Sequence, residues 1–387
     1  MNRGELCGMR AYTTEEMDLS GTVKSRPDDF QVEEIPTDFS LGNKFGIYRL
    51  EKTNLTTWQA VNQISSKLNI SSRRIGYAGL KDRRAITKQH ISIRGFQKQD
   101  VVIDDDKIEL SFVCTSSKPI KSGDLKGNKF IVTIRDIDKS ERKCRKLLER
   151  KRKQIKKEGI PNFYGTQRFG GKRAVTHLLG KELLKRNYKE AIMAYLTETS
   201  ERENDRTQKA RDRLKDEEDF EEATDYFPRN LDYERKLIKR IVDSSPQWNE
   251  DWLKVLQALP KNLRRLFVHA YQSYIFNLSL SDLIRDTNIN NFPAKVVGYT
   301  TKLKEDKFDR MIKKNLKKDG IEPKDFKFKS MPELSSEGAV RAALIKPEIK
   351  IEDVSEDKAN PGKAEATVSF SLKPGRYATV VLRELLV

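Results

Sequence analysis

The sequence of 387 residues has few of the residue types that mark disulfide-rich or metal-dependent proteins. It contains three cysteines and three histidines, all far apart in the chain. No CxxC, HExxH or HxE arrangement occurs among them. A disulfide framework or a cysteine-rich zinc site is therefore excluded, and histidine-based metal catalysis has little to build on.

Long apolar runs are also missing. No segment approaches the roughly 20 apolar residues that a membrane-spanning helix needs. The first 20 residues lack the apolar stretch of a signal peptide. These absences predict a cytoplasmic protein without a membrane partner.

Nucleotide-binding and hydrolase motifs are absent as well. No GxGxxG follows a predicted strand, and no GxSxG occurs. The segment that ends at Gly171-Lys172-Arg173 fails as a phosphate-binding loop, because Thr166 stands where the first glycine is required. The sequence therefore gives no support for a nucleotide cofactor.

What the sequence does have is positive charge. Lys and Arg number 76 against 58 Asp and Glu, a net charge of +18. Such an excess favours RNA or DNA as the partner ahead of an acidic membrane. The densest cationic segment is 139–158, with eleven Lys or Arg and three Glu. It predicts a helix with one strongly positive side, which either is simply solvated or contacts phosphates.

The order of predicted elements indicates an α+β protein with an insertion. Alternating or apolar-rich segments predict strands up to about residue 134, with one amphipathic helix over 58–68. Residues 172–290 are mainly helical, most clearly over 262–280, while 201–225 is either a helix or a loop. Residues 301–330 are expected to be irregular. Strand patterns return over 366–372 and 377–382, and these strands are expected to close the first sheet.

One carboxylate stands out in the segment 73–89. Asp82 is surrounded in sequence by six Lys or Arg residues, and Gly76 and Gly79 allow a tight backbone or the close approach of a ligand. The positive surroundings favour an ionised carboxylate, which is a usable nucleophile or base. The same pattern also fits an ordinary turn with surface salt bridges.

A second segment, 160–171, places three aromatic residues within seven positions, together with Asn162, Gln167 and Arg168. Aromatic rings that stack on bases and amides that read base edges are typical of RNA recognition. A core-packing aromatic loop is the alternative.

At these segments the chain resembles the TruD family of tRNA pseudouridine synthases, and its composition is archaeal-like. The matching segments follow the order of the family's motifs from about residue 20 to the C-terminus. They are Lys24 with Pro27-Asp28-Asp29-Phe30 and Val32-Glu33-Glu34, Gly79-Leu80-Lys81-Asp82, Leu125–Phe130, Asn162–Gly170 and Pro374–Glu384.

The resemblance implies a fold and domain boundaries. The expected fold is a pseudouridine-synthase-type catalytic domain with a mixed or antiparallel sheet flanked by helices. An α-rich α+β domain, the TRUD domain, would interrupt it. We therefore expect residues 1–171 and 336–387 to form the catalytic domain and residues 172–335 to form the insertion.

The resemblance also implies an activity: conversion of uridine to pseudouridine in tRNA, most typically at position 13. No metal and no organic cofactor would be needed, and a monomer is expected. The target base would be flipped out of its RNA helix into a pocket.

The implied site residues follow from the matched motifs. Asp82 would be the catalytic residue, acting at the base or at the ribose. Lys24 would lie near this carboxylate, Asn162 would position it or the base, and Tyr164 would pack on the uracil. The family often has Phe at this last position and Tyr one place earlier, whereas this chain has Phe163-Tyr164. Further expected residues are the following: Phe30 and Glu34 as wall and support of the site, and Lys81, Arg83, Arg84, Phe163 and Arg168 as RNA contacts.

An alternative function uses the same residues differently. A non-catalytic RNA-binding or RNA-folding protein would share the scaffold and the net charge of +18. It would gain nothing from a carboxylate in a cationic pocket, so Asp82 separates the two hypotheses.

Overall fold

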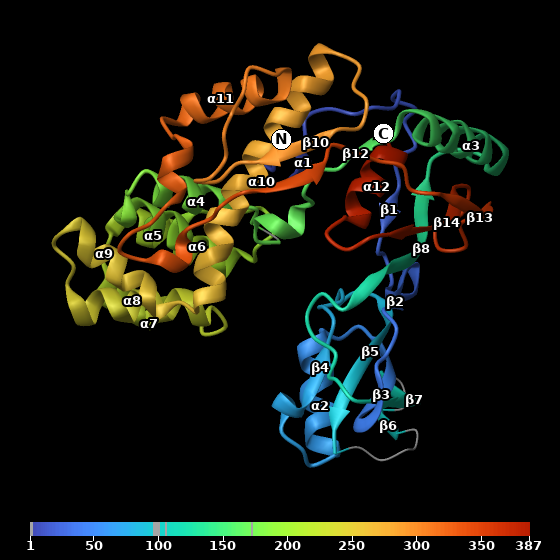
Figure 1. The fold of residues 1–387 in the computed structure, drawn as a ribbon, viewed down its shortest axis with the longest axis horizontal. Coiled ribbons are helices and arrows are strands. Elements are labelled where there is room, and N and C mark those ends of the chain that lie inside the picture. The colour runs from blue at the N-terminus through green and yellow to red at the C-terminus, as the bar shows by residue number, and fades with distance from the viewer. Residues whose placement is uncertain (1–2, 96–100, 105–106, 172) are drawn as a thin grey trace. The chain divides into compact units, whose positions relative to one another are not determined.

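A computed structural model describes residues 3–95, 101–104, 107–171 and 173–387 (Figure 1). The chain divides into two compact units. Unit 1 consists of Met1–Thr13 and Pro161–Ile345, and unit 2 of Thr14–Ile160 and Lys346–Val387. The chain thus leaves unit 2 near residue 160 and returns near residue 346, about ten residues from the predicted boundaries. The assignment of a catalytic and an inserted domain stays a prediction.

Over the residues that the structure describes, unit 2 contains a large sheet and three α-helices. Its strands are β1 (Thr22–Val23), β2 (Phe30–Pro36), β3 (Leu41–Thr53), β4 (Ile75–Tyr77), β5 (Ile86–Arg94), β6 (Val101–Asp104), β7 (Ile108–Ser116), β8 (Leu125–Ile137), β13 (Lys350–Glu356) and β14 (Ala364–Leu372). Its helices are α2 (Thr57–Lys67), α3 (Glu141–Glu158) and α12 (Ala378–Leu385).

The sheet is mixed, with the order β13-β14-β8-β2-β5-β3-β7-β6. The short strands β1 and β4 pair with β8 and β5. Neighbours in this order run antiparallel except β2 and β5, which are parallel, with Val32 opposite Thr87. Strand β14 pairs with β8, with Phe370 opposite Phe130. The last strands of the chain therefore belong to the same sheet as its first strands.

Helix α2 confirms the amphipathic helix predicted over 58–68. The Thr56 side chain accepts a hydrogen bond from the Gln59 amide, and the Gln59 side chain accepts one from the Thr56 amide, which completes a capping box. Val61 and Ile64 pack into a core with Leu50 and other residues of β3, β4, β5 and β7.

The C-terminal segment 377–382 is not a strand, and this prediction was wrong. It begins helix α12, whose buried residues Ala378, Val381, Leu382 and Leu385 recur every three or four positions. Val380 and Val381 favour a strand locally. The helix forms because this spacing buries one continuous apolar side.

A buried charge cluster joins the two parts of unit 2. Arg135 on β8 forms ion pairs with Asp29, at 2.7 Å, with Asp357, at 3.2 Å, and with Glu365. Asp29 belongs to the segment that resembles a family motif, and it lies directly before Phe30. Its carboxylate therefore fixes the start of β2 to the C-terminal part of the sheet.

Unit 1 is mainly helical. Its helices are α1 (Arg3–Leu6), α4 (Thr176–Leu184), α5 (Tyr188–Thr197), α6 (Asp205–Glu217), α7 (Phe220–Tyr226), α8 (Asp232–Ser244), α9 (Asn249–Val255), α10 (Lys261–Asp286) and α11 (Lys307–Asp319). Strands β10 (Pro293–Val296) and β11 (Ala339–Ala342) form an antiparallel pair. The short strands β9 (Ile160–Pro161) and β12 (Leu344–Ile345) lie where the chain passes between units.

Helices occupy two segments for which the sequence predicted either a helix or a loop, or an irregular structure. Residues 201–225 contain α6 and most of α7. Residues 301–330, expected to be irregular, contain α11, which the Asp306 side chain caps by accepting a hydrogen bond from the Asp309 amide. Phe308, Ile312 and Leu316 form its buried side. In the described ranges, no helix has both the length and the apolar character to cross a membrane.

Candidate active site

Asp82 lies in the loop between β4 and β5, beside Lys24. The Lys24 ammonium is 3.1 Å from a carboxylate oxygen of Asp82, and the Asp82 side chain is 35% exposed. The structure therefore brings Lys24 and Asp82 of the predicted site together as an ion pair, and the acid remains partly exposed to a substrate.

Lys24 is held over a buried ring. Its ammonium lies 3.7 Å from the centroid of the Phe30 ring, which is almost fully buried at the start of β2. The Lys24 backbone has φ of 64°. A residue with a Cβ adopts this left-handed conformation at a cost of about 1–2 kcal/mol. Such strain is concentrated at functional sites, and here it accompanies the placement of a cation against Asp82 and Phe30.

A buried ion pair supports the same loop from below. The ammonium of Lys81 binds the carboxylate of Glu34 on β2, and both side chains are buried. The backbone amide of His90 donates a 3.0 Å hydrogen bond to the same carboxylate. Burial by itself raises the pKa of Glu34, but His90 and Lys81 outweigh it and hold this pKa below its ordinary value. Glu34 therefore holds the residue that precedes Asp82.

Three further side chains fix the loop backbone. Thr57 at the start of α2 accepts a 2.9 Å hydrogen bond from the Lys81 amide. Gln89 on β5 donates to the Gly79 carbonyl at 3.3 Å and accepts from the Thr57 hydroxyl. Lys52 on β3 donates to the Asp82 carbonyl at 2.9 Å. The backbone on both sides of Asp82 is thus tied to the surrounding secondary structure.

The outer side of the loop is open. A Cβ at Gly79 would meet no atom within 4 Å, whereas one at Gly76 would lie 2.3 Å from the Ile120 carbonyl oxygen. Gly76 is therefore required by packing, and Gly79 leaves room beside Asp82. Arg83 and Arg84 are exposed, and the Arg84 guanidinium donates to the Ser25 carbonyl.

A second cluster lies in unit 1, around the aromatic segment. Arg341 on β11 donates to both the carbonyl and the side-chain oxygen of Asn162, each at 2.7 Å. The Asn162 amide group donates to the Ala342 carbonyl at 2.9 Å. Asn162 is buried, and these bonds fix the position of its side chain.

Tyr164 is the half-buried aromatic residue of this cluster. Its ring lies 4.3 Å from the Arg341 guanidinium carbon and 5.8 Å from that of Arg168. Its other neighbours include Phe276, which packs edge-on against it at 5.5 Å, and Asn277, whose side chain bonds both its amide and its carbonyl. The backbone of Tyr164 is thus fixed from α10, and its ring lies near two cations.

The remaining predicted residues of unit 1 differ in exposure. Phe163 is 1% exposed, so its ring packs inside the unit and offers no stacking surface in this conformation. Arg168 is half-buried and donates to the Ser273 hydroxyl at 3.2 Å.

The chain, including both clusters, matches a known protein family. A model of the family described as tRNA pseudouridine synthase D (TruD) matches residues 6–295 and 288–385. The chain belongs to the tRNA pseudouridine synthase D family.

Archaeal members of this family align along almost the whole chain. A protein of Methanosarcina acetivorans named "Probable tRNA pseudouridine synthase D" is 33% identical over 423 residues, which cover 97% of this chain and 95% of that protein. A protein of Archaeoglobus fulgidus with the same name is also 33% identical, with coverage of 99% and 98%. A crystal structure from Methanosarcina mazei, described by the name tRNA pseudouridine synthase D, has a TM-score of 0.84 and 31% identity and covers 100% of this chain.

Several supporting residues of these clusters were missed in the sequence. Lys52, Asn277 and Arg341 each lie far along the chain from the motif that they hold. Lys52 follows Tyr48 and Leu50 at alternate positions of β3, and a lysine in this apolar register was the only signal for it. No local pattern marks Asn277 or Arg341.

Lys52 gives a pH-dependent prediction. Burial lowers the pKa of Lys52 to about 8, although the charge of Asp82 acts in the opposite direction. Between pH 8 and about 10.4, the ordinary lysine value, the unfolded chain binds more protons at this residue than the folded chain. The contribution of Lys52 to stability therefore rises with pH across this window.

We predict that the free energy of unfolding of the wild type, minus that of Lys52→Met, increases by about 1 kcal/mol or more between pH 7.5 and 9.5. Urea unfolding of both proteins at each pH measures this difference. A difference that does not vary with pH would show that the buried ammonium keeps the pKa of an exposed lysine.

Proposed function

We propose that this protein isomerises uridine to pseudouridine in tRNA, most typically at position 13, with Asp82 as its catalytic residue. The observation that carries the proposal is the ion pair between Lys24 and Asp82. Asp82 lies on a loop whose backbone is hydrogen-bonded to side chains at Gly79, Lys81 and Asp82. A fixed and accessible carboxylate is what attack on the base or at the ribose requires.

The reaction needs no second reactant. The bond between the ribose carbon and the base nitrogen breaks, the base turns, and a bond from the same ribose carbon to a base carbon forms. The base carbon that forms the new bond loses a proton, and the freed base nitrogen gains one, so substrate and product are isomers. The chain therefore has to supply only a nucleophile or base, a place for the turning base and protection from water.

Access to the target uridine requires base flipping. A base inside an RNA helix costs a few kcal/mol to extrude, and contacts to phosphates and bases offset this cost. We assign phosphate contacts to Arg83 and Arg84, which are exposed beside Asp82, and to Arg168. The burial of Lys81 and Phe163 favours a positioning role for both over a direct RNA contact.

The unit 1 cluster is proposed to bind the base. The resemblance implies that Tyr164 packs on the target uracil, and base stacking on an aromatic ring contributes about 1–3 kcal/mol. Arg341 and Asn277 support this role, because they fix Asn162 and the backbone of Tyr164. The cytoplasmic location and the monomeric state stay predictions from the sequence.

The alternative is a non-catalytic RNA-binding protein on the same scaffold, supported by the net charge of +18. The geometry at Asp82 favours the enzyme. A protein that only binds RNA would be expected to dispense with an accessible carboxylate, because a carboxylate repels phosphates.

We predict that Asp82→Asn lowers pseudouridine formation by about 10³-fold or more while tRNA affinity changes only a few-fold. The amide keeps the shape of the side chain and removes its charge. Carbodiimide labelling of unmodified tRNA, followed by primer extension, locates the product to one nucleotide, and filter binding gives the affinity.

The matched control is Asp38→Asn, which removes another carboxylate of unit 2 that pairs with a lysine, Lys126, at the surface. It should convert tRNA as the wild type does. Full activity of Asp82→Asn would contradict the catalytic assignment. No product from the wild type, despite tight salt-sensitive binding, would favour the RNA-binding alternative.

A further inference from the structure

The outer side of α3 is a continuous positive surface. Arg142, Lys146 and Lys153 are exposed and follow one another at intervals of four and seven residues, so they lie along one line of the helix. Among the residues that the structure describes, none of these three cations has an ion pair. They span about 17 Å at 1.5 Å per residue.

The rotation of α3 is fixed by what it buries. Cys144, Leu148 and Ile155 face the interior of unit 2, together with Lys151. The Lys151 ammonium donates to the Thr14 hydroxyl at 2.9 Å and to the Glu15 carbonyl. Since the buried lysine and the apolar residues lie on one side, the free cations are held on the opposite side, and little further ordering is needed when they bind.

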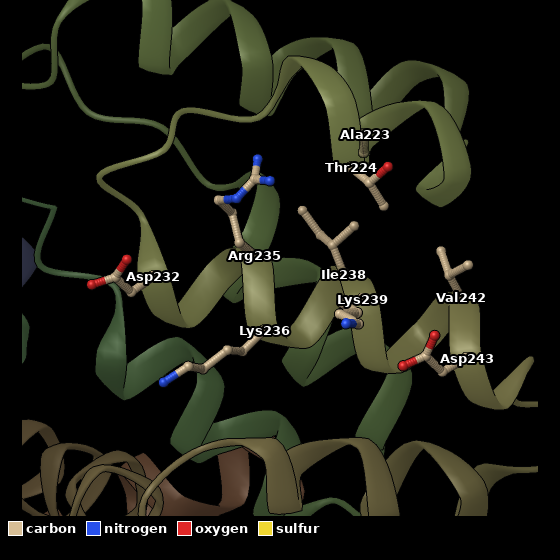
Figure 2. Close-up of a pocket in the computed structure, with 9 residues that line it drawn as sticks. All are labelled: Ala223, Thr224, Asp232, Arg235, Lys236, Ile238, Lys239, Val242 and Asp243. Carbon is tan, nitrogen blue, oxygen red and sulfur yellow. The ribbon is translucent and has the colours of Figure 1, made fainter.

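Helix α8 in unit 1 shows that this arrangement is not a general consequence of the composition. It carries four Lys or Arg and three Asp or Glu. Figure 2 shows Lys236 and Lys239 on α8 between Asp232 and Asp243, around a cavity of about 520 Å³. The cations of α8 are flanked by acidic residues at both ends of the helix, whereas the charges on the outer side of α3 are almost all positive.

We propose that the outer side of α3 binds phosphates of the tRNA substrate, through Arg142, Lys146 and Lys153. An anionic membrane has the same charge, but a helix that binds a bilayer needs an exposed apolar side. The apolar residues Leu148 and Ile155 are buried here. RNA is therefore the partner that fits, and its identity as tRNA rests on the proposed function.

The test replaces the three cations together, as Arg142→Ala/Lys146→Ala/Lys153→Ala. The loss of three phosphate contacts should make the negative slope of log affinity against log salt shallower by about 2. It should also raise the Kd for tRNA at least tenfold near 0.1 M salt. The control Lys236→Ala/Lys239→Ala/Arg240→Ala removes the same charge from α8 and should change the Kd less than threefold. Circular dichroism checks the folding of each variant.

The swap Arg142→Lys/Lys146→Arg/Lys153→Arg keeps all three positive charges. A wild-type slope in this variant would further support phosphate binding by the outer side of α3. Unchanged affinity and slope in the α3 variant would overturn the proposal, as would an equal loss in both alanine variants. Binding of wild type, but not of the α3 variant, to vesicles of anionic lipid with no difference on tRNA would assign the surface to a membrane instead. A wild type that binds tRNA steeply with salt but forms no pseudouridine would contradict the proposed function and not this surface.

A different observation concerns Leu80, two residues before Asp82. Its side chain is 74% exposed. The carbonyl of Gly79 and the amide of Lys81, on either side of Leu80, are both hydrogen-bonded to side chains of the surrounding elements. A large apolar side chain is thus held in solvent on a fixed backbone, next to the carboxylate proposed to act on an extruded base.

We infer that Leu80 is a positioning residue that fills the space left in the RNA stack when the target uridine is flipped out. Apolar side chains inserted between bases are a known means of stabilising an unstacked nucleic acid. This inference also rests on the proposed function, because it requires that a base be extruded.

The test uses the inactive Asp82→Asn background, in which bound tRNA keeps its uridine. The fluorescent base 2-aminopurine, placed next to the target uridine, brightens when it unstacks. Leu80→Ala should reduce this increase at saturating protein by at least half, whereas Leu80→Met should retain it. Leu41→Ala, which truncates another exposed leucine of unit 2, is the control.

An unchanged fluorescence increase with Leu80→Ala would overturn the role of Leu80, and so would an equal loss with Leu41→Ala. Absence of any increase in the Asp82→Asn protein would overturn it too, because no base would then leave the stack. Pseudouridine formation by the wild type, measured separately, decides the proposed function independently of these results.

Discussion

The ion pair between Glu34 and Lys81 is the interaction on which the candidate active site depends. Both side chains are buried, and removal of either partner from such a pair costs about 3–5 kcal/mol because the other charge stays unpaired. The pair joins β2 to the residue before Asp82, so the position of the carboxylate is set by the sheet and not by the loop alone. Phe30 begins the same strand, and Lys24, which directly follows β1, places its ammonium over the Phe30 ring.

The other supports of the loop come from different elements of unit 2. Thr57 begins α2, Gln89 lies on β5 and Lys52 lies on β3. The side chain of each makes one hydrogen bond to the backbone between Gly79 and Asp82. The mixed order of the sheet makes this possible, because β2, which carries Glu34, and β3, which carries Lys52, both pair with β5. The fold therefore acts as a rigid frame for one short and accessible loop, which is the form of preorganisation that catalysis requires.

Much of this frame could be predicted from the sequence, because strand alternation, the cap of α2 and the family motifs are local signals. The strand predicted over 377–382 was wrong because β-branched residues outweighed a helical spacing that depends on burial. Helix α11 was missed because its many lysines outnumber the few apolar residues that form its buried side. The motif residues Lys24, Asp82, Asn162 and Tyr164 could be named, but the partners Lys52, Asn277 and Arg341 could not. Their roles arise from contacts between distant segments, and among the three only Lys52, a lysine at an apolar strand position, has a signal in the sequence.

The most direct test of this account is a double-mutant cycle on the buried pair, with Glu34→Gln, Lys81→Met and the combined variant. The rate of pseudouridine formation in tRNA is measured together with the free energy of unfolding. If the pair positions Asp82, each single variant that remains folded should lose about 10²-fold in rate. The combined variant should be no slower than the slower single variant, because both changes remove the same interaction. Losses that multiply, or single variants that fold and retain the wild-type rate, would contradict the claim that this pair holds the catalytic loop.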